Sequence, residues 1–277
     1  YGIGFKLGNT ELRDKVQSTL LDMLDDGTFL SIAEEWGLEE SICLSADNVV
    51  NDSDLAVDKG NFFVELGSVV SKLAEGMLAS LAIFVLTLVF SLPLGLLLMF
   101  VRLSKVNVIR WIAKIYISIM RGTPLMLQLL VVFFGPYYVF GISLSYSYRF
   151  YAVIIGFALN YAAYFAEIFR SGIQAIPAGQ SEAATVLGYT RAQTFVRIIL
   201  PQMTRIVLPP VTNEVITLVK DTSLAFALAY TEMFTLAKQI AAASASIMPL
   251  FIAGAFYYIF NFMVAWIMEY IEKKMRY

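Results

Sequence analysis

Histidine is absent from the 277-residue sequence, and Cys43 is its only cysteine. The lack of histidine excludes a His-ligated metal, a histidine general base and a histidine proton switch. A single cysteine excludes an internal disulfide bond. Charged residues are also scarce, at 15% of the chain, whereas soluble domains carry about 25%. Together with 58% hydrophobic residues, this composition is typical of a membrane protein.

The few charges are divided unevenly along the chain. Residues 1–59 contain 4 Lys/Arg and 13 Asp/Glu, whereas residues 60–277 contain 16 Lys/Arg and 9 Asp/Glu. An acidic soluble piece therefore precedes a basic membrane piece. The sequence starts at Tyr1, without a Met or a signal peptide, and we expect it to be part of a longer polypeptide.

The acidic piece is predicted to contain one strand, two helices and a linker. Residues 1–9 favour a short strand, residues 10–27 a helix that ends at Gly27, and residues 28–38 a second short helix. About 45 residues are too few to bury a core of their own. Residues 45–60 are polar and acidic, which is typical of a linker.

The basic piece is predicted to cross the membrane five times, at residues 77–101, 124–141, 150–169, 206–233 and 247–271. The first stretch has 25 residues and no charge, which is enough for about 30 Å of hydrocarbon. We expect Pro93 to kink it. The segment before the second span is predicted to be an interfacial helix over residues 108–121, with an apolar face of Val108, Ile112, Ile115 and Ile119.

The basic residues predict the orientation, because cytoplasmic loops are enriched in Lys and Arg. Alternating spans place the 102–121 turn, the 170–205 segment and the C-terminal tail on one side. These three segments carry Arg102, Lys105, Arg110, Lys114, Arg121, Arg170, Arg191, Arg197, Arg205, Lys273, Lys274 and Arg276. That side is therefore predicted to be cytoplasmic, and five spans then put the acidic piece outside.

One cytoplasmic segment, SEAATVLGYTRAQTFVRIILPQ (181–202), is small-faced and helix-forming. Its composition alone is typical of an ordinary helix-turn, and Glu182 alone of an acid at a helix N-terminus. Its spacing is more specific: Glu182-Ala183-Ala184, three residues, Gly188, nine residues, then Ile198-x-Leu200-Pro201. This pattern resembles the EAA loop of the permeases of ABC importers. The resemblance implies a cytoplasmic coupling helix in a groove of an ATPase, with Glu182 paired to a basic group and Ala183, Ala184 and Gly188 supplying the fit.

Three more segments resemble the polar amino-acid branch of that family: RGTPLMLQL (121–129), YAAYFAEIFRSGI (161–173) and LVKDTSLA (218–225). The N-terminal piece resembles the end of a type II solute-binding protein of the amino-acid class. The implied organisation is a binding-domain tail (1–44), a linker (45–64) and a permease domain (65–277). The expected fold is an all-α membrane protein with five transmembrane helices, an interfacial helix and a coupling helix, preceded by a short α/β remnant of the binding domain.

The fourth span contains the charges Lys220 and Asp221, about 21 Å along the helix from Ile206. Charges at membrane depth usually pair or line a cavity. Asp221, Thr222 and Ser223 can cap a helix that restarts there, and its free N–H groups would face the carboxylate of a bound amino acid. A structural Lys220–Asp221 pair that closes the helix break is an equal alternative.

The third span places Asn160, Tyr164 and Glu167 on one face. These side chains are candidates for a polar substrate pathway, and the alternative is that they hold helices together by hydrogen bonds. Asn213 and Glu214 on the fourth span carry the same ambiguity.

No G-x-x-x-x-G-K-[ST] motif occurs in the sequence, so ATP hydrolysis is expected in a separate subunit. The chain itself is expected to be no enzyme and to hold no catalytic residue, metal or cofactor. The resemblance implies a homodimer of permeases, two ATPase subunits that bind ATP and Mg, a fused or separate solute-binding domain, and no nucleic acid. It also implies a multi-pass protein in the lipid bilayer of a bacterial plasma membrane, with the N-terminus extracellular and the C-terminus cytoplasmic.

The expected activity is import of glutamine or glutamate by alternating access. A cationic amino acid such as arginine, histidine or lysine is the alternative, because Glu167 and Asp221 suit a positive side chain. A ligand-gated channel or sensor is the alternative of another class, although it needs no Glu-Ala-Ala pattern and should carry a cytoplasmic output domain. An intramembrane enzyme is the least favoured, since Lys220 and Ser223 are the nearest approach to a catalytic set.

Overall fold

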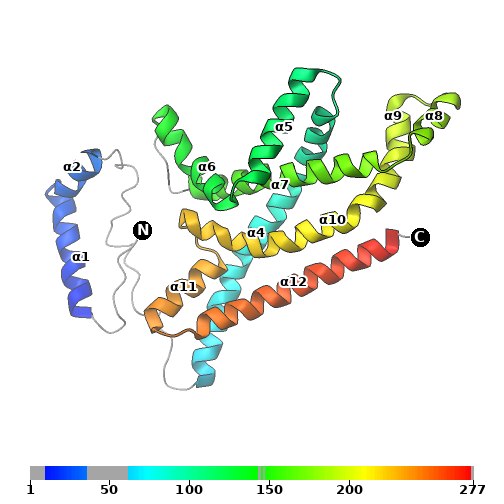
Figure 1. The fold of residues 1–277 in the computed structure, drawn as a ribbon. Coiled ribbons are helices and arrows are strands. Elements are labelled where there is room, and N and C mark those ends of the chain that lie inside the picture. Colours follow the sequence, from blue (N-terminus) through cyan, green and yellow to red (C-terminus); the bar gives the residue numbers. More distant parts are fainter. Residues whose placement is uncertain (1–9, 36–61, 143–144, 146, 276–277) are drawn as a thin grey trace. The chain divides into compact units, whose positions relative to one another are not determined.

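A computed structural model describes residues 10–35, 62–142, 145 and 147–275, and every regular element in these ranges is a helix (Figure 1). The two predicted N-terminal helices are confirmed as α1 (Thr10–Asp25) and α2 (Thr28–Glu35). Gly27 separates them at φ +79°, a left-handed conformation that glycine adopts without steric cost. The strand predicted at residues 1–9 and the linker predicted at 45–60 lie outside the described residues.

The rest of the chain forms long helices joined by short connections. They are α4 (Phe62–Arg102), α5 (Asn107–Gly122), α6 (Leu125–Phe140), α7 (Tyr148–Gln174), α8 (Ala178–Val186), α9 (Arg191–Thr194), the π-helical turn η3 (Phe195–Ile199), α10 (Leu200–Asp221), the 3₁₀ helix η4 (Thr222–Leu228), α11 (Met233–Ser244) and α12 (Met248–Met275). The spans predicted at 77–101, 124–141, 150–169 and 247–271 correspond to α4, α6, α7 and α12. The span predicted at 206–233 covers most of α10, all of η4 and the non-helical residues 229–232. The segment predicted as an interfacial helix is helical, as α5, and its position at a membrane surface stays a prediction.

In the described part, three helices are long and apolar enough to cross a membrane: α4, α7 and α12. The helices α5 and α6 meet this criterion only as a pair, and the pair is bent by 114° around Thr123 and Pro124. This bend supports the predicted boundary between an interfacial helix and the following span. Alone, α6 has 16 residues, or about 24 Å.

The helix α4 continues through Pro93 without a break. Two residues later, Gly95 lies against α7: a Cβ there would be 2.8 Å from Phe165 Cβ and 3.1 Å from the Ala162 carbonyl oxygen. The SLPLG stretch is therefore a site of close helix packing. This packing is possible because Gly95 has no side chain.

The described residues form two compact units. One contains the residues up to Leu81 with 130–153 and 225–256; the other contains 82–129, 154–224 and those from Tyr257 onward. In the second unit α7 is the central helix, since 72% of its most apolar 18-residue stretch is buried. Glycines allow the contacts there, because Gly156 faces Leu129 of α6 and Gly172 faces Val207 of α10.

The first unit joins the start of α4 to α11 by a similar contact. A Cβ on Gly76 would lie 2.9 Å from Met233 Cα, so the two helices approach at their backbones. Beyond this contact, the Lys238 amine lies over the rings of Phe226 and Phe234, 4.6 Å and 5.8 Å from their centroids. Such cation–π contacts hold η4 and α11 together.

Candidate substrate pathway and coupling helix

The predicted coupling segment forms a short helix, α8, at a turn between α7 and α10 (Figure 1). Glu182 lies on its exposed surface, and in the described part of the chain no ion pair joins it to another residue. The helix ends at Gly188, whose φ is +80°. The Gly188 amide donates to the Thr185 carbonyl and the Tyr189 amide to the Ala184 carbonyl, both at 3.0 Å. These two bonds define a Schellman C-cap.

A second cap follows at once and fixes the direction of α9. Thr190 and Gln193 form a capping box, in which the Thr190 hydroxyl accepts from the Gln193 amide and the Gln193 side chain accepts from the Thr190 amide. Ala184 is only 1% exposed, so its small side chain packs inside this chain. The segment instead presents Val186 and Leu187, which are 88% and 74% exposed and which the sequence patterns did not single out.

The α-helix ends at Asp221, close to the predicted break, but no gap follows and no capped helix restarts there. The helix α10 runs to Asp221 and continues directly as the 3₁₀ helix η4. Thr222 and Ser223 cap no new helix, because their hydroxyls donate back to the carbonyls of Val219 and Lys220, both at 2.8 Å. Such back-bonding is common inside helices.

The chain breaks its helix later, between η4 and α11. Ala229 has φ +52°, which is rare for a residue other than glycine. Glu232 then caps α11: its carboxylate accepts from the amides of Phe234 and Thr235, both at 2.7 Å, from the Thr235 hydroxyl at 2.9 Å and from the Ser80 hydroxyl of α4 at 3.2 Å. Glu232 is fully buried and was not among the predicted site residues.

Asp221 takes part in a polar cluster between α7 and α10. Its carboxylate accepts a 2.7 Å hydrogen bond from the Tyr161 hydroxyl. No ion pair within 4 Å joins it to Lys220 among the residues the structure describes. The two side chains interact electrostatically at longer range, so the alternative of a structural pair stays a prediction. Glu214, two turns earlier on α10, interacts electrostatically with both Asp221 and Arg121.

Tyr164 and Asn160 both face α5, as the shared face predicted. The guanidinium of Arg121 lies 5.3 Å from the centroid of the Tyr164 ring. The Asn160 amide donates to the Met120 carbonyl at 3.1 Å and to the Gln128 side chain at 2.9 Å. Because Asn160 is 4% exposed and both bonds are internal, its contacts are those of helix packing; a pathway role stays a prediction.

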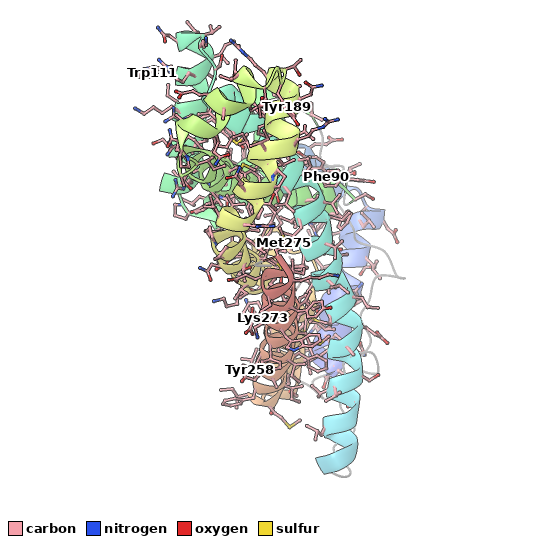
Figure 2. The ribbon with its side chains drawn as sticks, turned by 90° about the vertical axis from the view of Figure 1, so that its right-hand side faces the viewer. Phe90, Trp111, Tyr189, Tyr258, Lys273 and Met275 are labelled. Atoms are coloured by element: carbon pink, nitrogen blue, oxygen red, sulfur yellow. The ribbon has the colours of Figure 1, made fainter. Side chains whose placement is uncertain are left out.

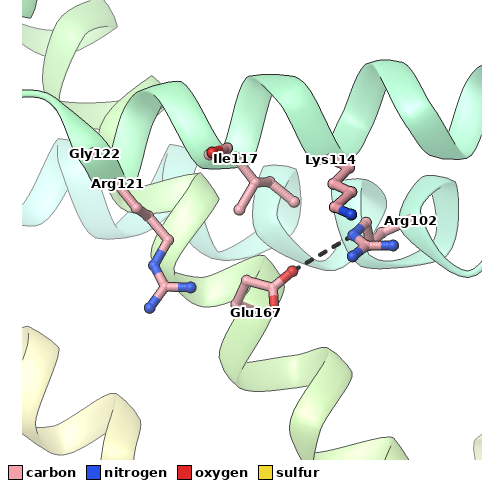
Figure 3. Close-up of a pocket in the computed structure, with 7 residues that line it drawn as sticks. Arg102, Lys114, Ile117, Arg121, Gly122 and Glu167 are labelled. Atoms are coloured by element: carbon pink, nitrogen blue, oxygen red, sulfur yellow. Dashed lines mark ion pairs between the residues drawn. The ribbon is translucent and has the colours of Figure 1, made fainter.

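Glu167 is neutralised by two arginines. Its carboxylate lies 2.6 Å from Arg170 Nη2 and 3.6 Å from Arg102 Nε, the second pair being dashed in Figure 3. These cations reduce its suitability as a partner for a positive substrate. Within the described ranges, no group of three or more His, Cys, Asp or Glu side chains is placed to hold a metal ion.

Three long apolar helices in the described part, with a polar cluster between α7 and α10, are typical of a multi-pass membrane protein. The chain belongs to the family of binding-protein-dependent transport system inner membrane components, whose family model matches residues 91–277. It is a permease of that family.

Among known relatives, the chain is 36% identical to the L-cystine transport system permease protein TcyB of Bacillus subtilis, over 73% of this chain and 86% of the relative. It is 36% identical to the arginine transport system permease protein ArtQ of the same organism (73% and 91%). It is 35% identical to a putative glutamine transport system permease protein GlnP of Rickettsia felis (73% and 92%). A crystal structure of an amino acid ABC transporter with histidines matches 77% of this chain and 99% of its own, at 28% identity and a TM-score of 0.69.

Proposed function

We propose that the chain is the permease of an ATP-driven importer for polar amino acids of the glutamine or glutamate type. The polar cluster around Asp221 carries the proposal. It brings Tyr161, Asp221, Glu214 and Arg121 together within one unit of a helical membrane protein, where polar groups usually line a pathway. The relatives are named as permeases of cystine, arginine and glutamine transport systems, which supports an amino acid as the class of substrate.

In this proposal five spans cross the membrane, and α10 with η4 and α11 supplies the one that hydropathy does not identify. The side that carries α8 is cytoplasmic, and the N-terminus lies outside, because the basic segments gather on the α8 side. Residues 1–44 are the tail of a solute-binding domain, residues 45–64 a linker and residues 65–277 the permease domain. The binding domain delivers the amino acid to the outer end of the pathway.

Coupling to ATP takes place at α8. Its exposed Glu182, Ala183, Val186 and Leu187 offer a charge and an apolar tip to one of two separate ATPase subunits, which bind ATP and Mg. Two permease chains form a homodimer, and movement of both α8 helices switches the pathway between outward and inward openings.

The pathway residues are Tyr164, Lys220, Asp221, Thr222 and Ser223, with Asn160 and Glu167 in supporting contacts. Lys220 is exposed at the end of α10, where its amine suits the substrate carboxylate. The carboxylates of Asp221 and Glu214 favour a second candidate, import of a cationic amino acid, since either can hold a positive side chain.

The test is uptake of labelled glutamine into lipid vesicles that contain the full-length chain and its ATPase, with ATP on the ATPase side. We expect Glu182→Lys to lower ATP-coupled uptake more than about tenfold, because like charges across an interface cost several kcal/mol. Glu269→Lys is the matched control, since it reverses an exposed charge on another helix, α12. Lys220→Ala should lose uptake but keep assembly and basal ATP hydrolysis.

Two results decide between the alternatives. If labelled arginine outcompetes glutamine and Asp221→Asn abolishes this preference, the cationic candidate holds. If the wild type moves amino acids downhill without ATP, the importer is contradicted and a channel or sensor takes its place.

A further inference from the structure

A cavity of about 350 Å³ lies between the end of α4, one face of α5 and α7. It does not include the Asp221 carboxylate. It is lined by Arg102, Lys114, Ile117, Ser118, Arg121, Gly122 and Glu167. Figure 3 shows Arg102 and Lys114 on one side of Glu167 and Arg121 on the other.

The lining has an excess of positive charge. Three of its side chains are cations, and its one acid, Glu167, is paired with Arg170 at 2.6 Å and with the lining residue Arg102 at 3.6 Å. Lys114 makes no ion pair within the part of the chain that the structure describes. Arg102 Nε is buried and lies 3.6 Å from Glu167 Oε1 in an ion pair, but it has no hydrogen-bond partner among the residues that the structure describes. An acceptor that enters the cavity would supply one. The cavity therefore suits an anion with several oxygen acceptors.

The helix α5 sets this cationic wall beside an apolar one. At 100° per residue, Lys114, Ser118 and Arg121 follow one stripe of the helix. The next stripe contains Trp111, Ile115 and Ile119, which are 63%, 42% and 53% exposed; Figure 2 labels Trp111. On the face opposite this apolar stripe, Ala113 and Ile117 are buried in the chain. A ligand that fits both stripes has an anionic head and hydrocarbon chains.

We propose that this cavity binds the phosphate headgroup of an anionic phospholipid, whose acyl chains lie along the Trp111–Ile115–Ile119 stripe. Arg102, Lys114 and Arg121 supply the charge and Ser118 a hydroxyl donor, a set that matches phosphate oxygens. Basic pockets between membrane helices bind such headgroups. The position of α5 at a membrane surface rests on the proposed function, and Arg121 is shared with the polar cluster of that proposal. Lipid binding can still be measured without substrate or ATP.

Native mass spectrometry of the permease with its ATPase, titrated with phosphatidylglycerol in detergent, tests the site. We expect Lys114→Gln to weaken binding about fivefold, the effect of one basic group near an anionic lipid. Lys105→Gln is the matched control: it removes the same charge from an exposed position before α5 that does not line the cavity, and binding should stay unchanged. Ser118→Ala, which keeps all charges, should also weaken binding.

Two further probes separate the source of the phosphate. Diacylglycerol with the same chains lacks the phosphate and glycerol 1-phosphate lacks the chains, so both should bind at least about tenfold more weakly than phosphatidylglycerol. Equal affinity for glycerol 1-phosphate would overturn the lipid assignment in favour of a soluble phosphate. Equal losses in Lys105→Gln and Lys114→Gln would reduce the effect to general surface charge and overturn the site. Lipid binding is read without transport, so failed amino-acid uptake contradicts the proposed function alone.

Discussion

At the scale of single residues, the buried carboxylate of Glu232 is the feature that sequence reasoning missed. In the sequence it is one acid in the stretch YTEMF, and glutamate is not among the residues preferred at an N-cap. Its partner Ser80 is 152 positions away, and no periodicity of either segment indicates that they meet. A buried carboxylate without hydrogen bonds is very costly. The hydroxyls of Ser80 and Thr235 and two amides of α11 donate to Glu232 and offset this cost.

We expect Ser80→Ala to lower the free energy of unfolding by about 1.5–3 kcal/mol, the range for hydrogen bonds to charged groups. The loss would be measured by denaturation of the assembled permease in mixed micelles. Ser91→Ala is the matched control, because Ser91 is equally buried on α4 but its hydroxyl has no hydrogen-bond partner in the described part of the chain. Equal losses in both variants would show that the bond to Glu232 adds nothing specific.

At the scale of elements, the sequence predicts a helix end where neighbouring residues determine it, but not where the end depends on the surrounding structure. The end of α8 is encoded by Gly188 and the start of α9 by Thr190, so neighbouring residues suffice. At the end of α10 the same reasoning failed, because Thr and Ser can cap a new helix or return their hydroxyls to the carbonyls of the old one. The true break at Ala229 contains neither glycine nor proline, and therefore gives no local signal.

The Schellman cap leads to a prediction for α8. Gly188→Ala should destabilise the loop by about 1–2 kcal/mol, because a Cβ is strained at a positive φ, and should lower ATP-coupled uptake. Gly179→Ala is the control: neither glycine has an atom within 4 Å of an added Cβ, but only Gly188 has a positive φ. In α8, alanine at 179 should be neutral or stabilising. Limited proteolysis of the loop measures both effects, and equal cleavage of the two variants would contradict the prediction.

At the scale of the whole molecule, hydropathy predicts where the long helices lie in the sequence but not how deeply each is buried among the others. The most apolar 18-residue stretches of α4 and α12 are 28% and 17% buried, whereas that of α7 is 72% buried. All three helices are apolar in sequence, so hydropathy does not predict that α7 is the most buried of them. Its burial accompanies close contacts with neighbouring helices, as at Gly156 and Gly172. On α12, Tyr258, Phe262 and Trp266 recur every fourth residue and are 72%, 63% and 63% exposed, Tyr258 being labelled in Figure 2. Such a face needs lipid or a second copy of the chain around it.

A mixing experiment tests whether two copies work together. If a homodimer must move both α8 helices, a complex with one Glu182→Lys copy is uncoupled. Equal amounts of wild-type and Glu182→Lys chains, assembled together, should then give about one quarter of the wild-type uptake, since random pairing in a twofold dimer leaves one quarter fully wild type. Mixing with Glu269→Lys should leave uptake unchanged and so controls for assembly. Uptake near one half would mean that each copy couples to its own ATPase independently, and the homodimer mechanism would fail even if the chain imports amino acids.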